Sequence, residues 1–116
     1  MFLAPLTIVA SEFIPPFTPF TYNGRVADSR LLTHFWRVAG FSGAQPSKPD
    51  FVVNPITEGE ITFDHVHGPS WQPNKEVFLN GKILSQTPPS SDFIQIMGIA
   101  KDSKTLVVKF SEPIIL

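Results

Sequence analysis

The stretch Glu76-Val77-Phe78-Leu79-Asn80-Gly81-Lys82-Ile83-Leu84-Ser85 decides the fold class. Two runs of β-favouring residues flank its Asn-Gly pair, and this arrangement is the strongest short-range signal of a β-hairpin. The preferred connection is a type I′ turn, in which both central residues have positive φ. We therefore predict a hairpin with a type I′ turn at Asn80-Gly81.

A similar pattern occurs in the first half of the chain. A second pair, Asn23-Gly24, also lies between β-favouring residues and predicts a second type I′ hairpin. Further along, Phe35–Ser42 and Phe93–Ala100 share the order Phe, any residue, Arg or Gln, Val or Ile, any residue, Gly, Phe or Ile, small residue. The spacing from the turn glycine to the phenylalanine is 11 positions in the first copy (35 − 24) and 12 in the second (93 − 81).

We interpret this pattern as an internal repeat of two similar β-units, spanning residues 21–53 and 78–110. Neither unit could bury its apolar face alone, but together they can close a core. The leading phenylalanines of the two octets are expected at equivalent core positions. Gly40 and Gly98 are expected at equivalent bends, because a glycine inside a strand weakens it unless it has such a role.

The remaining chain predicts more short strands. About eight to ten β-favouring runs are separated by close-set turns, and no segment has a long 3.6-residue period, which is typical of a sandwich or barrel. The 116 residues amount to one domain. We predict an all-β domain over 1–116, a small β-sandwich or barrel of short antiparallel strands, with at most a turn or two of helix near 28–34.

The first twenty residues have an unusual composition. They contain four Pro and four Phe, and Glu12 is their only charged side chain. Prolines keep the backbone extended and are excluded from central sheet positions. We expect residues 1–20 to form an extended arm that packs partly on the domain and partly on a neighbouring subunit.

Composition excludes several classes of function. The formal net charge is −1, which argues against duplex DNA binding, and the absence of Cys excludes disulfides, thiol nucleophiles and Cys-type zinc sites. The apolar start contains Pro5 and no basic residue, so it is not typical of a secretion signal. No run approaches the ~20 apolar residues of a membrane-spanning helix. We expect neither a nucleic-acid nor a membrane partner.

The sequence contains no catalytic or metal-binding constellation. His65 and His67 would share one face of a strand, but the local sequence offers no third metal ligand. His34, beside two aromatic residues, is interpreted as a packed histidine. Gly-x-Ser-x-Gly and glycine-rich phosphate loops are absent. We therefore predict a protein that is not an enzyme and binds no metal or cofactor.

Trp36 and Trp71 are candidates either for core or interface anchors or for sugar-stacking platforms.

The second hairpin also carries a family resemblance. Val77–Pro89, followed by Phe93–Ala100, resembles a pattern in virion surface proteins of tailed bacteriophages, which include small capsid cement (decoration) proteins and domains of head and tail fibres. Ala10–Glu12, Val38–Phe41 and Glu58–Ile61 are similar to earlier parts of that pattern, as is a tryptophan before the hairpin, here Trp71.

The resemblance implies a non-enzymatic, β-rich, oligomeric protein of the virion surface. On this basis we expect a capsid cement protein that bridges subunits of the major capsid protein and forms a homo-oligomer, a dimer or trimer. The alternative is a tail-fibre or baseplate subunit that binds a host-surface glycan. The residues expected at interfaces are apolar and lie in the arm, at the two tryptophans and near the C-terminal end: Phe2, Phe13, Ile14, Phe17, Trp36, Trp71, Ile114 and Ile115.

Overall fold

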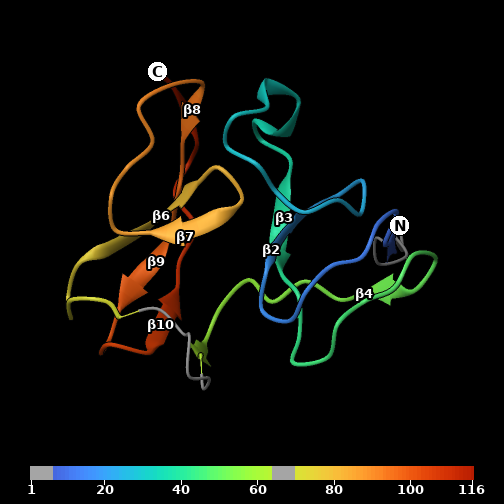
Figure 1. The fold of residues 1–116 in the computed structure, drawn as a ribbon, viewed down its shortest axis with the longest axis horizontal. Coiled ribbons are helices and arrows are strands. Elements are labelled where there is room, and N and C mark those ends of the chain that lie inside the picture. Colours follow the sequence, from blue (N-terminus) through green and yellow to red (C-terminus); the bar gives the residue numbers. More distant parts are fainter. Residues whose placement is uncertain (1–6, 64–69) are drawn as a thin grey trace, which may run out of the picture.

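The computed structural model describes residues 7–63 and 70–116, and these residues are almost entirely β-structure and loops (Figure 1). The prediction of an all-β fold is confirmed. The helical turn expected near 28–34 is a single 3-10 turn, η1 (Leu32–His34). The strands are β1 (Ile8–Val9), β2 (Pro19–Thr21), β3 (Val38–Phe41), β4 (Val52–Val53), β5 (Glu60–Thr62), β6 (Glu76–Asn80), β7 (Ile83–Ser85), β8 (Phe93–Ile94), β9 (Ile96–Ala100), β10 (Thr105–Val108) and β11 (Ile114–Ile115).

The largest element is a curled antiparallel sheet in the second half, with strand order β5-β10-β9-β6-β7. Three two-stranded antiparallel ribbons complete the fold: β1-β4, β2-β3 and β8-β11. In Figure 1 the first half, with β2, β3 and β4, lies beside the sheet of the second half. The architecture is consistent with a small β-sandwich or barrel.

The first half contains the same bulged strand pair as the second. In β2–β3, Phe20 pairs with Gly40, and the register then shifts before Thr21. In β6–β9, Val77 pairs with Gly98, and the register shifts before Phe78. Each bulge therefore lies at the same place relative to a strand glycine.

Backbone hydrogen bonds on both sides of the bulge also correspond. The Ser42 and Ala100 amides donate to the Thr18 and Lys75 carbonyls, each at 2.9 Å. The Tyr22 and Leu79 amides donate to the Arg37 and Gln95 carbonyls at 3.0 and 3.1 Å. Positions on the first strand of each pair differ by 57 residues (77 − 20) and positions on the second by 58 (98 − 40), so the geometry follows the sequence pattern.

Gly40 and Gly98 are both buried, and another segment of the chain passes close to each. A Cβ on Gly40 would lie 2.7 Å from Pro55 Cβ and 2.9 Å from the Ile56 carbonyl oxygen. A Cβ on Gly98 would overlap the Val107 carbonyl oxygen. The leading phenylalanines of the octets differ from expectation: Phe93 lies in β8 and is fully buried, whereas the ring of Phe35 follows η1 and is half-buried.

Both Asn-Gly hairpins form, but the predicted type I′ turns are wrong. Gly24 and Gly81 have positive φ (+76° and +62°), whereas Asn23 and Asn80 are not among the positive-φ residues. In the second hairpin Asn80 pairs with Ile83, so the central residues are Gly81-Lys82. A positive φ at the first central residue alone is the pattern of a type II′ turn, which requires only one left-handed residue.

Residues 7–20 of the predicted N-terminal arm lie along their own half of the domain. β1 pairs with β4, Ile14 pairs with Ser47, and β2 pairs with β3. The prolines do keep this segment out of the large sheet. It folds back on its own half instead, because narrow ribbons satisfy its amides without placing a proline in a central strand.

Two apolar clusters form the core. The larger contains twelve buried residues: Ala27, Phe41, Ile61, Phe63, Trp71, Val77, Leu79, Phe93, Met97, Ala100, Leu106 and Val108. The smaller lies in the first half and contains six: Ile8, Ala10, Ile14, Phe20, Ala39 and Val53. Strand β3 contributes to both clusters: Ala39 belongs to the smaller, Phe41 belongs to the larger, and Val38 packs against the larger. This strand therefore connects the two clusters.

Candidate interaction surfaces

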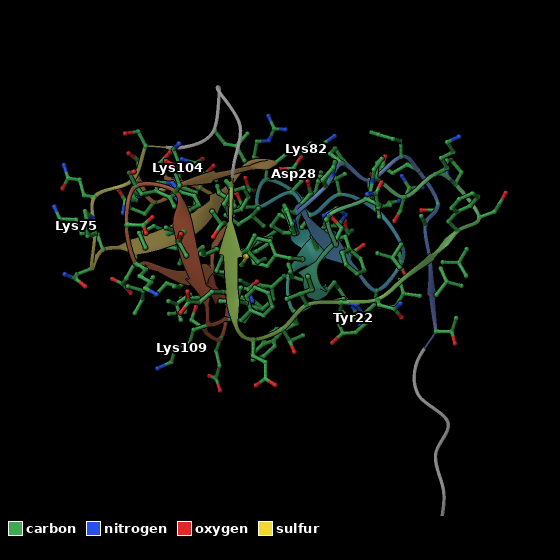
Figure 2. The ribbon with its side chains drawn as sticks, turned by 90° about the horizontal axis from the view of Figure 1, so that it is seen from below. Tyr22, Asp28, Lys75, Lys82, Lys104 and Lys109 are labelled. Atoms are coloured by element: carbon green, nitrogen blue, oxygen red, sulfur yellow. The ribbon has the colours of Figure 1, made fainter. Side chains whose placement is uncertain are left out.

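A polar contact attaches the second hairpin to the first half. The Ser29 amide donates to the Gly81 carbonyl at 3.0 Å, and the Gly81 amide donates to Ser29 Oγ at 2.7 Å. Ser29 is fully buried. Next to it, Asp28 accepts bonds from the backbone and side chain of Arg30, which hold the pKa of this carboxyl below its usual range. Asp28 lies beside Lys82 of the second hairpin (Figure 2). This contact is structural.

His34 is a packed residue, as predicted. Its Nδ1 accepts a hydrogen bond from the Asp28 amide at 3.0 Å, so the ring is neutral there. Burial lowers the pKa of His34. This hydrogen bond holds the ring against the backbone of Asp28.

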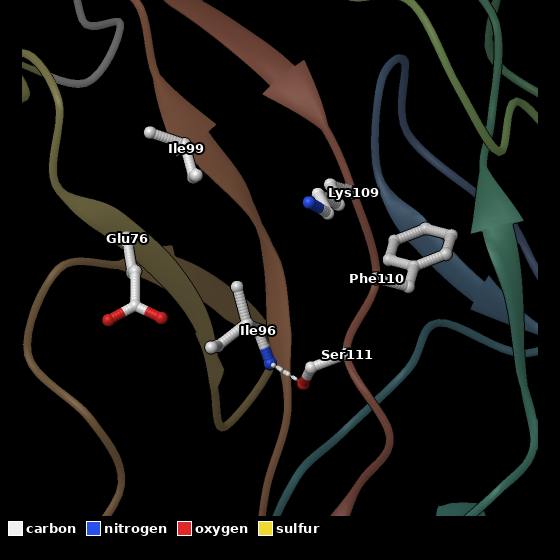
Figure 3. Close-up of a pocket in the computed structure, with 6 residues that line it drawn as sticks. All are labelled: Glu76, Ile96, Ile99, Lys109, Phe110 and Ser111. Carbon is white, nitrogen blue, oxygen red and sulfur yellow. Dashed lines mark hydrogen bonds between the residues drawn. The ribbon is translucent and has the colours of Figure 1, made fainter.

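A shallow pocket of about 180 Å³ lies against β9 and the segment after β10 (Figure 3). It is lined by Glu76, Ile96, Ile99, Lys109, Phe110 and Ser111. Sites for small molecules are usually ~300–1,000 Å³, so this pocket is smaller than a typical ligand site.

Within residues 7–63 and 70–116 no three His, Cys, Asp or Glu side chains are grouped to hold a metal ion. His65 and His67 lie outside the described residues.

Two of the residues predicted at interfaces belong to the chain's own core, which corrects their assignment. Ile14 is 0% exposed and packs in the smaller cluster. Trp71 is 6% exposed and meets the Phe63 ring edge-on at 5.3 Å between centroids. Phe17 is half-buried against the larger cluster and also meets the Phe63 ring edge-on, at 6.0 Å between centroids. Phe2 lies outside the described residues.

The other four predicted interface residues are exposed: Phe13, Trp36, Ile114 and Ile115. They belong to two exposed apolar regions, and the sequence had indicated only some of the residues in each. The first, which we call the ribbon surface, is the open face of the β1–β4 ribbon, on which Val9 and Val52 lie. Phe13 and Phe51, close to this ribbon in sequence, are also exposed. On the β1–β4 ribbon the pair Ile8–Val53 is buried and the pair Val9–Val52 is exposed, so one face packs and the other is open. The alternation of side chains along each strand could have predicted which residues share this face. The pairing of β1 with β4 could not be predicted from local sequence.

The second, which we call the terminal surface, comprises two exposed apolar segments: Leu31, Leu32 and Trp36 around η1, and Ile114, Ile115 and Leu116 at β11, where Ile114 and Ile115 face opposite sides of their ribbon. Its two segments are about eighty residues apart in sequence and are connected by edge-on ring contacts. Ile115 pairs with Phe93, the Phe93 ring meets the Phe35 ring at 5.7 Å, and the Phe35 ring meets the Trp36 ring at 6.1 Å. In Figure 1 the C-terminus and the turn containing η1 lie at the same end of the molecule.

No protein-family model matches the chain, and no curated protein or solved structure shows significant similarity to it. Among the residues that the structure describes, no helix is long and apolar enough to cross a membrane. The exposed apolar surfaces are therefore the features on which a functional interpretation rests.

Proposed function

We propose that the protein is a non-enzymatic structural protein of a phage virion, a capsid cement protein that bridges subunits of the major capsid protein on the head surface. The motif resemblance around the second hairpin suggests this class. The observation that carries the proposal is the ribbon surface, where one ribbon buries Ile8 and Val53 and leaves Val9 and Val52 open.

The ribbon surface is suited to contact a large flat partner. Val9 and Val52 lie opposite each other on it, and Phe13 and Phe51 are both more than half exposed. Burying on the order of 300 Å² of apolar area here would contribute about 8 kcal/mol at ~25 cal/mol per Å², before the cost of docking. Repeated over a shell, such contacts raise the barrier to subunit separation, because the bridging protein must detach before the capsid subunits part.

The test is co-sedimentation of the full chain with heads assembled from the major capsid protein of the genome that encodes it. We expect the wild type to bind and V52K to bind at least tenfold more weakly. The matched control is I83K, because Ile83 lies on edge strand β7 and is similarly exposed (66% against 57%). Failure of the wild type to bind, or equal loss in both variants, contradicts the proposal.

A second candidate function, binding of a host-surface glycan by a fibre or baseplate subunit, is favoured by Trp36. This indole is 57% exposed, and its backbone has a φ of +63°, which is unfavourable for a bulky residue. Strained residues often belong to functional sites. Binding to purified host polysaccharide that W36A abolishes, without capsid binding by the wild type, would select this function instead.

A further inference from the structure

Each hairpin turn contains an Asn side chain that can be modified without an enzyme. In an Asn-Gly pair the glycine nitrogen can attack the Asn side-chain carbon Cγ, because glycine has no side chain to hinder the approach. A bond forms between this nitrogen and Cγ, the bond from Cγ to Nδ2 breaks, and the glycine proton leaves with Nδ2 as ammonia. Water then opens the succinimide ring at either carbonyl and gives aspartate or isoaspartate. The chain contains two such pairs, Asn23-Gly24 and Asn80-Gly81.

At Asn80 the structure holds both reacting groups. The Gly81 amide, which would be the nucleophile, donates to Ser29 Oγ at 2.7 Å, and this contact is buried. The Ser29 amide donates in turn to the Gly81 carbonyl at 3.0 Å. The Asn80 Nδ2, which would be the leaving group, donates to the Thr87 carbonyl at 3.1 Å. Succinimide formation at Asn80 therefore requires the second hairpin to separate from the first half.

At Asn23 the reacting groups are held more weakly. Asn23 is exposed and lies beyond the end of β2. Ser11 Oγ donates to its backbone carbonyl at 3.0 Å, whereas its side chain forms no hydrogen bond among the described residues. The Gly24 amide donates at 2.9 Å to the carbonyl of Thr21, three residues earlier. Opening of this one turn therefore releases the nucleophile while the side chain is already free to rotate.

The cost of opening also differs between the two turns. Val77 and Leu79, in the strand that leads into the second turn, are fully buried in the larger cluster. In the first turn, Tyr22 and Asn23 are already exposed. The free energy of local opening is smallest in exposed segments and largest in core strands. Because attack by the glycine nitrogen requires the opened turn, it is favoured at Asn23.

Modification at Asn23 would disturb the packing of β1. Gly24 lies so close to this strand that a Cβ on it would overlap the Val9 carbonyl oxygen. The Ser11 amide donates to the Gly24 carbonyl at 2.9 Å. Isoaspartate adds one carbon atom to the main chain of the turn, and both products add a negative charge. The longer turn therefore displaces Gly24 against the strand that carries Val9 of the ribbon surface.

We propose that Asn23 is a site of spontaneous deamidation in the folded protein and that the contact with Ser29 protects Asn80. Water is the only co-reactant, and ammonia is the leaving group. Isoaspartate at position 23 weakens the attachment of β1, so the protein loses stability as it ages. This chemistry belongs to the chain itself and does not depend on capsid binding.

Tryptic digestion separates the two sites, because cleavage after Arg25, Lys75 and Lys82 places Asn23 in residues 1–25 and Asn80 in residues 76–82. The full-length protein is incubated at mildly alkaline pH, folded or in concentrated urea, and the mass gain of each peptide is followed with time. In the folded protein we expect conversion at Asn23 to be faster by about tenfold or more, because buried amide bonds protect Asn80. In urea the two rates should be similar.

The same ratio of rates in both conditions would show that the fold does not select the site, and would overturn the proposal. So would a folded protein in which Asn80 converts at least as fast as Asn23, or in which neither converts while both do so in urea.

Two variants test the structural causes. S29A removes the acceptor of the Gly81 amide and should accelerate conversion of Asn80, with Asn23 in the same sample as the internal reference. Equal acceleration at both sites, or none at Asn80, contradicts the protective role of Ser29. N23Q removes the reactive side chain, because glutamine forms its larger ring far more slowly. Aged wild-type protein should unfold at a lower urea concentration than fresh protein, whereas N23Q should not change with age; equal ageing of both would contradict the assigned consequence.

Discussion

The two halves of the molecule contain the same bulged strand pair, yet only the second half extends it into a sheet. In the second half β10 pairs with β9 on one side and with β5 on the other. In the first half the equivalent contact is a single bridge between Phe41 and Ile56. The first half therefore remains a set of narrow ribbons, and the cluster confined to it contains six buried residues against twelve in the larger cluster.

A proline accounts for the difference. Ile56 contacts β3 as Val107 contacts β9, so Pro55 occupies the place of Leu106. Leu106 pairs with a residue on each side, Ala100 and Ile61. Pro55 has no N–H and cannot serve in a central strand. Two similar local patterns can thus form sheets of different size, depending on whether one residue has a backbone N–H to donate.

Adding a methyl group to the strand glycines should have the largest effect on stability, and the effect should differ between the two positions. We expect G98A to lower the free energy of unfolding by about 3 kcal/mol, and G40A by about 2 kcal/mol. The Gly98 Cβ would meet the backbone of central strand β10, whereas the Gly40 Cβ would meet a lone bridge. Urea denaturation measures both values.

The control is G43A, because a Cβ at Gly43 would meet nothing within 4 Å. It should change stability by less than about 0.5 kcal/mol. If G98A were as mild as G43A, the close approach of β10 to Gly98 would be wrong.

A serine forms hydrogen bonds with each hairpin turn. Ser29, at the second turn, is buried, whereas Ser11, at the first, lies near the surface. S29A removes the acceptor of the buried Gly81 amide and should cost about 2 kcal/mol. S11A removes a hydroxyl that donates to the carbonyls of Asn23 and Gly24 near the surface, and should cost less than about 0.5 kcal/mol. Thermal and urea unfolding of the two variants compare them; equal losses would show that burial does not distinguish the attachments.

The smallest expected effect concerns His34, whose counterpart 58 positions later is Asp92. Burial lowers the pKa of His34 in the folded state, so the unfolded chain binds the proton first. Its contribution to stability is complete above about pH 6.5 and is lost as pH falls below that value, by at most ~1.4 kcal/mol per pH unit.

Urea denaturation between pH 7.5 and 5 follows this loss. The variant H34N keeps an uncharged acceptor at the position and should show a flatter dependence over the same range. A wild-type profile that matches H34N would show that protonation of His34 is not linked to unfolding.

Local patterns predicted the elements whose physics is local. The Asn-Gly pairs indicated both hairpins because a left-handed residue is rare elsewhere, although the strand register selected a different turn type. Gly40 and Gly98 were identified because few other roles suit a glycine within a β-favouring run. The packed role of His34 followed from its aromatic neighbours.

Exposure could not be predicted in the same way. Ile14 and Trp71 are large and apolar like Phe13 and Trp36, but the first pair is buried and the second exposed. Leu31, Leu32 and Leu116 gave no signal in isolation, because an apolar residue in a short segment is as typical of a core as of an interface. Only the packing of distant segments decides which face is covered.

The sequence by itself determined an all-β chain with two glycine-broken strands and two Asn-Gly turns, since backbone conformation and strand preference are local properties. Tertiary structure alone decided that the proline-rich start folds back onto β4, that Phe35 and Phe93 bring Trp36 near β11, and that Pro55 ends a sheet that Leu106 continues. These outcomes depend on long-range pairing, in which each strand's neighbours determine which of its faces and edges remain open.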